Sequence, residues 1–191
     1  MRLTVLERGH RLRTRALFGF VRLVSRQPVV DAVKLALYRP EFYGAGELTH
    51  EAMRGPSAWS VGDRELMAAF VSNVNQTQFC IAAHSATSGI WYGDDDKVTA
   101  TLTDLETAPI DERLRATLRL LAKLTREHRV DTDDMRAVLA RGVTPAQIND
   151  ALAVCLAFNI TDRLADAFGF ELASPEAMNT GARYLLKRGY R

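Results

Sequence analysis

The 191-residue chain has little cysteine, proline or aromatic character: two cysteines, six prolines and 8% aromatic residues. Two cysteines, Cys80 and Cys155, are too few for a disulfide scaffold, and free thiols fit a reducing compartment, so we expect a cytoplasmic protein. No apolar run approaches the ~18 residues of a membrane-spanning helix, which predicts no integral membrane segment. The run from Leu17 to Val24 is interrupted by Arg22 and lacks a clear cleavage site, which argues against a signal peptide.

An excess of charge of one sign is also missing. The formal net charge is only +2, which does not favour a nucleic-acid partner. The charge is unevenly placed, because residues 1–26 carry seven arginines and one glutamate, a net +6, and the rest of the chain sums to −4. The same segment has an apolar stripe among its arginines. We expect it to pack on its own domain or on a neighbouring subunit; an anionic membrane surface is the alternative.

Strand signals are nearly absent, whereas apolar residues recur at intervals of three and four almost throughout. This periodicity predicts an all-α protein with an N-terminal helical extension (1–54), a core (55–173) and a C-terminal helix (174–191). Asp131 and the stretch Thr144-Pro145-Ala146-Gln147 are predicted to begin helices, as an N-cap and a capping box. The helices expected from the pattern span about 3–25, 28–38, 40–53, 61–75, 78–91, 97–105, 110–127, 132–141, 145–170 and 175–188.

The stretch Asn75-Gln-Thr-Gln-Phe-Cys-Ile-Ala-Ala-His84 places a thiol and an imidazole four residues apart, on one face of a helix. If Thr77 is the N-cap, Cys80 is the third helical residue, and the Thr77 side chain can accept from its backbone N–H. The free amides and the helix dipole favour a thiolate there, and His84 supplies the adjacent base. The alternative is a buried, inert cysteine, because Phe79 and Ile81 make this turn apolar.

Glu65 lies 15 positions before Cys80, on the preceding helix, with small residues after it that allow it to point inward. Acids are also common in the exposed first turn of a helix, which is the alternative reading. Spacing alone does not bring Glu65 to His84, since that depends on how the two helices cross. No metal is expected, because Cys80 and His84 are too few ligands for zinc and no other histidine has ligand spacing to them.

The residues from Glu65 through Cys80 to His84 resemble the core of the AhpD-like alkylhydroperoxidase and carboxymuconolactone decarboxylase superfamily. Residues 66–75, 141–150 and 158–168 resemble the helices that flank it, and the likeness covers about 57–173. It is most similar to the peroxidase-related branch with extra N-terminal helices. The resemblance implies an AhpD-like helical core, a homo-oligomer and no cofactor.

In that family the active site holds a glutamate, a Cys-x-x-Cys pair and a histidine four residues after the second cysteine. The resemblance makes Glu65 and His84 the proton relay and Cys80 the cysteine that attacks the peroxide. The first, resolving cysteine is replaced by Thr77, which is left as a possible hydrogen-bond donor to the thiolate. An external thiol or dithiol then takes over resolution, or Cys155 does so if its Cα lies roughly 4.4–6.8 Å from that of Cys80; otherwise Cys155 is plain core.

Two other functions stay open on the same fold. One is a decarboxylase or lactone-processing enzyme, a branch that generally lacks the cysteine pair. The retention of Cys80 in its place argues against it. The other is a non-enzymatic helical oligomer that has lost the peroxidase chemistry. Fold alone does not decide among these functions.

Overall fold

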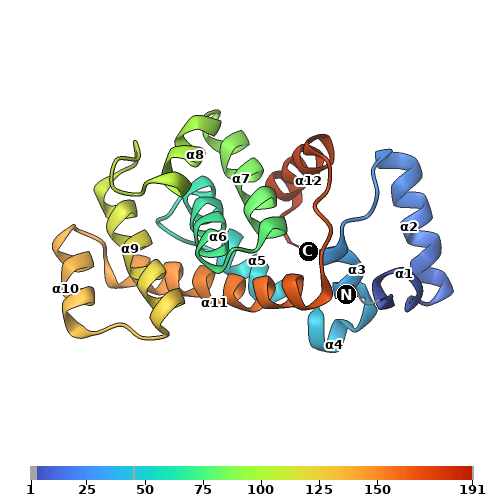
Figure 1. Ribbon diagram of the computed structural model, residues 1–191, viewed down its shortest axis with the longest axis horizontal. Coiled ribbons are helices and arrows are strands. Elements are labelled where there is room, and N and C mark those ends of the chain that lie inside the picture. The colour runs from blue at the N-terminus through green and yellow to red at the C-terminus, as the bar shows by residue number, and fades with distance from the viewer. Residues whose placement is uncertain (1–3, 45, 191) are drawn as a thin grey trace.

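The computed structural model describes residues 4–44 and 46–190, and within them the chain forms helices and no strand (Figure 1). The predicted all-α fold is confirmed. The helices are α1 (Val5–Arg8), α2 (Leu12–Ser25), α3 (Asp31–Tyr38), α4 (Pro40–Tyr43), α5 (Gly46–Arg54), α6 (Val61–Asn75), α7 (Gln78–Tyr92), α8 (Asp95–Thr103), α9 (Glu112–Glu127), α10 (Thr132–Ala140), α11 (Pro145–Phe168) and α12 (Pro175–Arg188).

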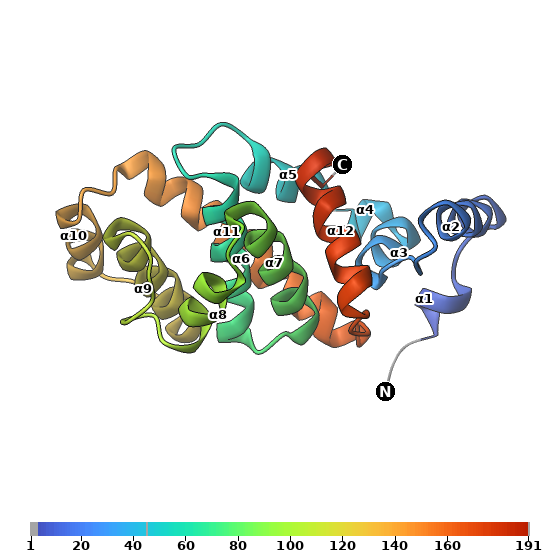
Figure 2. The same cartoon turned by 90° about the horizontal axis from the view of Figure 1, so that it is seen from above.

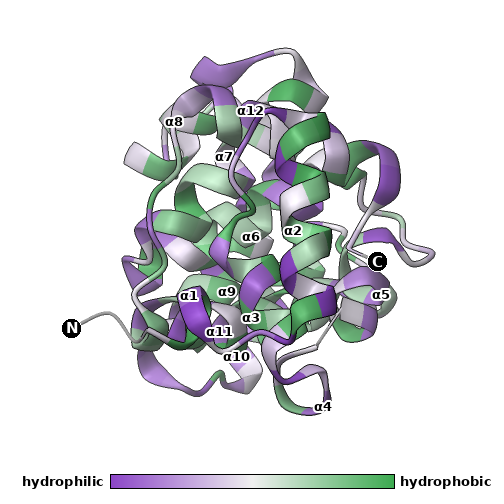
Figure 3. Ribbon diagram, turned by 90° about the vertical axis from the view of Figure 1, so that its right-hand side faces the viewer, coloured by the Kyte–Doolittle hydropathy of each residue, from purple (hydrophilic) through white to green (hydrophobic). Residues whose placement is uncertain are grey.

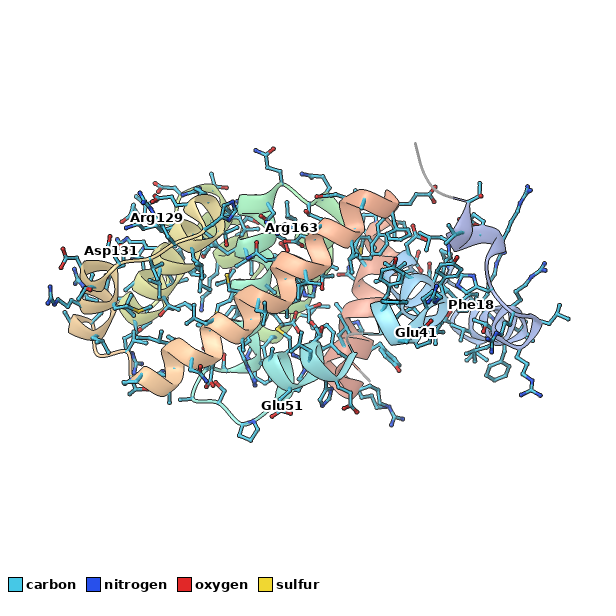
Figure 4. The ribbon with its side chains drawn as sticks, turned by 90° about the horizontal axis from the view of Figure 1, so that it is seen from below. Phe18, Glu41, Glu51, Arg129, Asp131 and Arg163 are labelled. Atoms are coloured by element: carbon cyan, nitrogen blue, oxygen red, sulfur yellow. The ribbon has the colours of Figure 1, made fainter. Side chains whose placement is uncertain are left out.

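The core forms around α6, which packs against α7, α9 and α11. Most of α6 is buried, and Leu66, Met67 and Val71 have no exposed surface, as expected for a helix that is apolar around most of its circumference. Helix α11 crosses the molecule along one side of this core, and its outward face carries Arg163 (Figure 4). Helix α9 is amphipathic and adds Leu118 on its buried face.

Capping side chains fix where the core helices begin. The predicted helix starts at Asp131 and Thr144 are confirmed, since both side chains form capping boxes at α10 and α11. Ser60 does the same at α6: its hydroxyl accepts from the Asp63 amide at 3.0 Å, and the Asp63 carboxylate accepts from the Ser60 amide at 3.1 Å. The start of α6, which carries Glu65, is therefore fixed locally.

Two predicted helices are broken in the structure. The helix expected over 3–25 is interrupted between α1 and α2, and its first residue lies outside the described residues. At this break the buried His10 bonds the Lys34 carbonyl at 2.8 Å, an interaction between distant segments that no local pattern reveals. The helix expected over 40–53 is likewise divided into α4 and α5.

Helix α2 projects at one end of the molecule and has no fully buried side chain (Figures 1 and 2). Its half-buried Phe18 makes a ring contact with His10, at 4.9 Å between centroids. Leu12 is 80% exposed, Leu23 77% and Phe20 64%, and Figure 3 shows apolar and polar residues mixed along its ribbon. The stripe therefore packs on the rest of the chain only at its start, where Leu6 of α1 is buried, and the expectation fails for its residues on α2. Contact of α2 with another subunit stays a prediction. Among the described helices, none is long and apolar enough to cross a membrane.

Leucine substitutions on α9 and α2 test whether α9 is part of the buried core and α2 is exposed to solvent. Leu121 has no exposed surface, so Leu121→Ala leaves a cavity and should lower the free energy of unfolding by about 2–5 kcal/mol. The matched variant Leu23→Ala should change it by less than about 0.5 kcal/mol, because that side chain contacts mainly solvent. Chemical denaturation measures both. A large loss in Leu23→Ala would show that α2 is covered in solution.

Candidate active site

Helices α6 and α7 bring Glu65 and His84 into contact. Gln76, in the left-handed conformation at φ 63°, ends α6, and the chain turns directly into α7. The two helices therefore pack closely, and His84 Nδ1 lies 2.7 Å from Glu65 Oε2. Both side chains are buried, Glu65 with 0% and His84 with 6% of its surface exposed. The inward orientation that the sequence leaves open for Glu65 is the one observed.

Two further groups hold the buried Glu65 carboxylate. Arg54 donates from Nη2 to Oε1 at 2.6 Å, and the Tyr190 hydroxyl lies 2.9 Å from Oε1 and 3.1 Å from Oε2. Burial by itself raises the pKa of Glu65, but the hydrogen bond and charge of His84, followed by Arg54, outweigh it and lower that pKa overall. Glu65 is therefore an ionised carboxylate at neutral pH.

The Glu65 carboxylate also decides the orientation of His84. A carboxylate only accepts hydrogen bonds, so His84 Nδ1 must be the donor, and whenever the ring is neutral its lone pair is on Nε2. The edge of the imidazole packs against Phe158 at 4.4 Å between ring centroids, with an interplanar angle of 77°. The ring is thus held from two sides, with its basic nitrogen on the side away from Glu65.

Cys80 is the third residue of α7, one helical turn before His84, and has no exposed surface. It packs in a small apolar cluster with Phe79, Ala165 and Met178. Thr77 is the N-cap residue of this helix, as the sequence analysis supposes, but the expected capping bond from its side chain is absent. The Thr77 hydroxyl instead donates to Asp166 at 2.8 Å, a partner on α11 that a local cap prediction does not include.

Asp162, on α11, is a site residue that the sequence analysis missed. It is 1% exposed and accepts from the Ser72 hydroxyl and the Asn75 amide, both at 2.8 Å. Its carboxylate and the Ser72 hydroxyl both interact with the Cys80 thiol. The stretch 158–168 was assigned to a flanking helix, but nothing in it shows that Asp162 faces inward while its neighbour Arg163 is exposed.

The electrostatics at Cys80 oppose the thiolate that its place in the helix predicts. Burial raises the pKa of the Cys80 thiol far above its usual value, and the neighbouring Asp162 carboxylate raises it further. The helix dipole contributes about 0.3–1 kcal/mol at such a position, whereas full burial shifts a pKa by up to about 3–5 units. Burial is the larger effect, so the resting form of Cys80 is the neutral thiol.

Cys155 is also buried and free. Its sulfur lies 3.6 Å from the Thr125 hydroxyl and 3.3 Å from the Asn159 amide nitrogen, so it has polar partners within the core. Cys155 and Asp162 are seven residues apart on α11, which is about 10 Å along the helix axis. In the described conformation no disulfide joins Cys80 and Cys155, and both cysteines are free.

No protein-family model and no curated protein matches the sequence. Solved structures do match. An uncharacterized peroxidase-related protein from Silicibacter sp. TM1040 aligns with a TM-score of 0.74 and 26% identity, covering 88% of each chain. In fold the chain is therefore AhpD-like, and it is similar to peroxidase-related proteins. A second structure, described as an alkylhydroperoxidase AhpD core and peroxidase-related protein from Ralstonia eutropha JMP134, aligns with a TM-score of 0.73 and 23% identity, over 90% of this chain and 91% of that one.

The AhpD-like assignment confirms the resemblance that the sequence gives over about 57–173. The alignment with the Silicibacter protein covers 88% of the chain, which is more than that range, so the shared fold extends beyond the core residues. In this chain α6 presents Glu65, and α7 presents Cys80 and His84. The roles of these three side chains stay a prediction at this point.

Neutralising Asp162 should expose its effect on the thiol. Asp162→Asn removes a negative charge beside Cys80, so the pKa of the thiol should fall and alkylation by iodoacetamide at pH 8 should accelerate about tenfold or more. Mass spectrometry of Cys80 across a pH series measures this. Loosened packing alone would raise the rate at every pH without moving the inflection, and the exposed Asp96→Asn is the matched control.

Replacing Glu65 should change how stability depends on pH. The folded pKa of Glu65 lies below its ordinary value of 4.5, so its contribution is full above that pH and is lost as the pH falls through the folded pKa. Glu65→Gln also leaves Arg54 buried without its counter-charge, and should cost about 3–5 kcal/mol at pH 7.

The difference between wild type and Glu65→Gln should then shrink in urea titrations as the pH falls below 4.5 and the native carboxylate becomes protonated. Glu47→Gln, an exposed change on α5, is the matched control and should cost less than about 0.5 kcal/mol. A difference that stays constant with pH would contradict the assignment of Glu65 as an ionised group.

Proposed function

We propose that the chain is a thiol-dependent peroxidase of the alkyl hydroperoxidase type, with Cys80 as its single peroxidatic cysteine. The observation that carries this proposal is the 2.7 Å contact between Glu65 of α6 and His84 of α7. Cys80 lies on α7 as well, one turn before His84. The 26% identity to a peroxidase-related protein supports it. A buried carboxylate that orients an imidazole next to a thiol is an arrangement suited to general base catalysis.

The first step removes the proton from the Cys80 thiol. His84 Nε2 accepts it, and the imidazolium that forms is stabilised by the Glu65 carboxylate on Nδ1. The thiolate attacks the distal oxygen of a hydroperoxide, the O–O bond breaks, and the alkoxide leaves as an alcohol after taking the proton from His84. Cysteine is oxidised to sulfenic acid while the peroxide is reduced to the alcohol.

The second step returns the sulfenic acid to the thiol. Since Thr77 replaces the resolving cysteine of the family, an external thiol condenses with the sulfenic acid and releases water; a second thiol then reduces the mixed disulfide. We do not assign this role to Cys155, which is buried and unpaired in the described conformation. We place the reaction in the cytoplasm, where such reductants are available, and in a homo-oligomer.

A second candidate function is an acid–base enzyme of the decarboxylase or lactone-processing kind. The observation that favours it is the full burial of the Cys80 thiol beside the Asp162 carboxylate, since burial first and that charge second raise the pKa of the thiol and keep the sulfur protonated. With a permanently neutral thiol, Glu65 and His84 still form an oriented acid–base pair. The two proposals differ in whether Cys80 changes oxidation state.

Trapping of sulfenic acid separates these two functions. Reduced protein receives stoichiometric cumene hydroperoxide together with a dimedone reagent, and mass spectrometry maps the adduct. We expect the label on Cys80, rising with peroxide, and Cys80→Ser should abolish peroxide turnover with an external thiol. The matched variant Cys155→Ser should keep both the label and turnover.

An unmodified Cys80 under a clear excess of peroxide would sink the peroxidase proposal and leave the acid–base function. A Cys80–Cys155 disulfide would instead show that α11 moves during the cycle and supplies the resolving thiol. Loss of Glu65 or His84 should slow the labelling of Cys80 by about 10²–10⁴-fold, the usual range for removing general base catalysis.

A further inference from the structure

A turn that follows α12 returns to the Glu65–His84 pair. We call it the α12 turn, Gly189–Tyr190. The Tyr190 hydroxyl lies 2.9 and 3.1 Å from the two Glu65 carboxylate oxygens and 3.4 Å from His84 Nδ1. Its ring lies nearly parallel to the His84 imidazole, at 6.3 Å between centroids and 19° between planes. Tyr190 thus contacts both members of the pair, although it is 125 residues from Glu65.

One face of α5 holds the α12 turn in place. Gly46, His50 and Arg54 are spaced four residues apart, so they lie on the same side of the helix. The Tyr190 amide donates to His50 Nδ1 at 3.2 Å, and Arg54 Nη2 donates to the Leu185 carbonyl at 3.1 Å. The Arg54 guanidinium also lies 5.1 Å from the centre of the Tyr190 ring. The same arginine therefore binds the turn and the Glu65 carboxylate.

Gly189 makes this return possible. Its backbone has φ 69° and ψ −149°, a conformation open to glycine and strained for other residues. A Cβ atom on Gly189 would also lie 2.6 Å from Cε1 of His50. The chain thus passes directly over His50, and this path places the Tyr190 side chain against Glu65 and His84.

We propose that Tyr190 is a positioning residue of the relay, which donates its phenol O–H to Glu65 and completes the set of donors that fixes this carboxylate. The inference deepens the proposed function, on whose relay it rests. Arg54 occupies Oε1 and His84 Nδ1 occupies Oε2, so Tyr190 bridges the two oxygens and keeps the carboxylate plane from rotating. A fixed carboxylate keeps the proton on His84 Nδ1 and leaves Nε2 as the base.

The chemistry of Tyr190 suits this role. Burial raises the pKa of the Tyr190 phenol, and the Glu65 negative charge raises it further. The phenol therefore stays protonated and acts as a donor throughout the range in which Glu65 is ionised. A hydrogen bond to the charged form of a carboxylic acid favours that form.

The test compares Tyr190→Phe with Tyr184→Phe. Both remove one hydroxyl from the C-terminal segment, but Tyr184 lies on α12 and is 57% exposed. In Tyr190→Phe the ring is retained, so its stacking on His84 is preserved while the donor to Glu65 is lost. We expect the pKa of the Glu65 carboxyl to rise by roughly half a unit to one unit, measured by NMR titration of ¹³C-labelled glutamate, with Glu65→Gln giving the assignment.

Long-range ¹H–¹⁵N spectra of the histidines provide a second readout. Wild type should show His84 with its proton on Nδ1, and Tyr190→Phe should show a mixture of the two tautomers. Gly189→Ala displaces the turn and should reproduce both changes. Tyr184→Phe should match wild type in every spectrum.

An unchanged Glu65 titration and an unchanged His84 tautomer in a folded Tyr190→Phe protein would overturn the inference. These readouts need no peroxide, so they are separate from the test of the proposed function. If the spectra change as expected but Cys80 is never oxidised, Tyr190 positions an acid–base pair that serves other chemistry. If Cys80 is oxidised in wild type, its labelling should slow about tenfold in Tyr190→Phe and be unchanged in Tyr184→Phe.

Discussion

The buried Glu65 carboxylate sets the strongest constraint on this structure. A charge without exposed surface is tolerated only where donors replace the water it has lost. Here the donors come from α5, from α7 and from the turn after α12. Three separate parts of the chain must therefore pack correctly around one residue of α6. The arrangement of these elements and the orientation of His84 are two results of the same requirement.

The surroundings of Cys80 follow a different logic. The start of a helix and a nearby imidazole both favour a thiolate, whereas an apolar cluster and the Asp162 carboxylate both oppose it. In this structure the apolar cluster and the Asp162 carboxylate outweigh the other two, since desolvation is a larger effect than the helix dipole. A reactive cysteine in such a place is one whose reactivity depends on local opening of α7, α11 or α12 rather than on a permanently low pKa.

The sequence predicts what is decided locally and leaves out what is decided by long-range contacts. Helix starts at Asp131 and Thr144 are readable because the capping residue and its partner are three positions apart. Residue spacing singled out His84, and the family resemblance joined it with Glu65 in one relay. The contact between them depends on the crossing of two helices. Arg54, Asp162 and Tyr190 carry no such signal, because each reaches the site from a distant element. The break at His10 was missed for the same reason, and the division of the chain at residues 54 and 173 stays a prediction.

The long separation in sequence between Glu65 and Tyr190 has a consequence for folding during translation. During synthesis Glu65 leaves the ribosome 125 residues ahead of its tyrosine partner, which at about 5–20 residues per second corresponds to roughly 6–25 s. Through that interval α6 and α7 are present while one donor to the carboxylate is missing. We therefore expect this pair of helices to stay loosely packed and hydrated until translation reaches the α12 turn. The relay would then be the last part of the core to form.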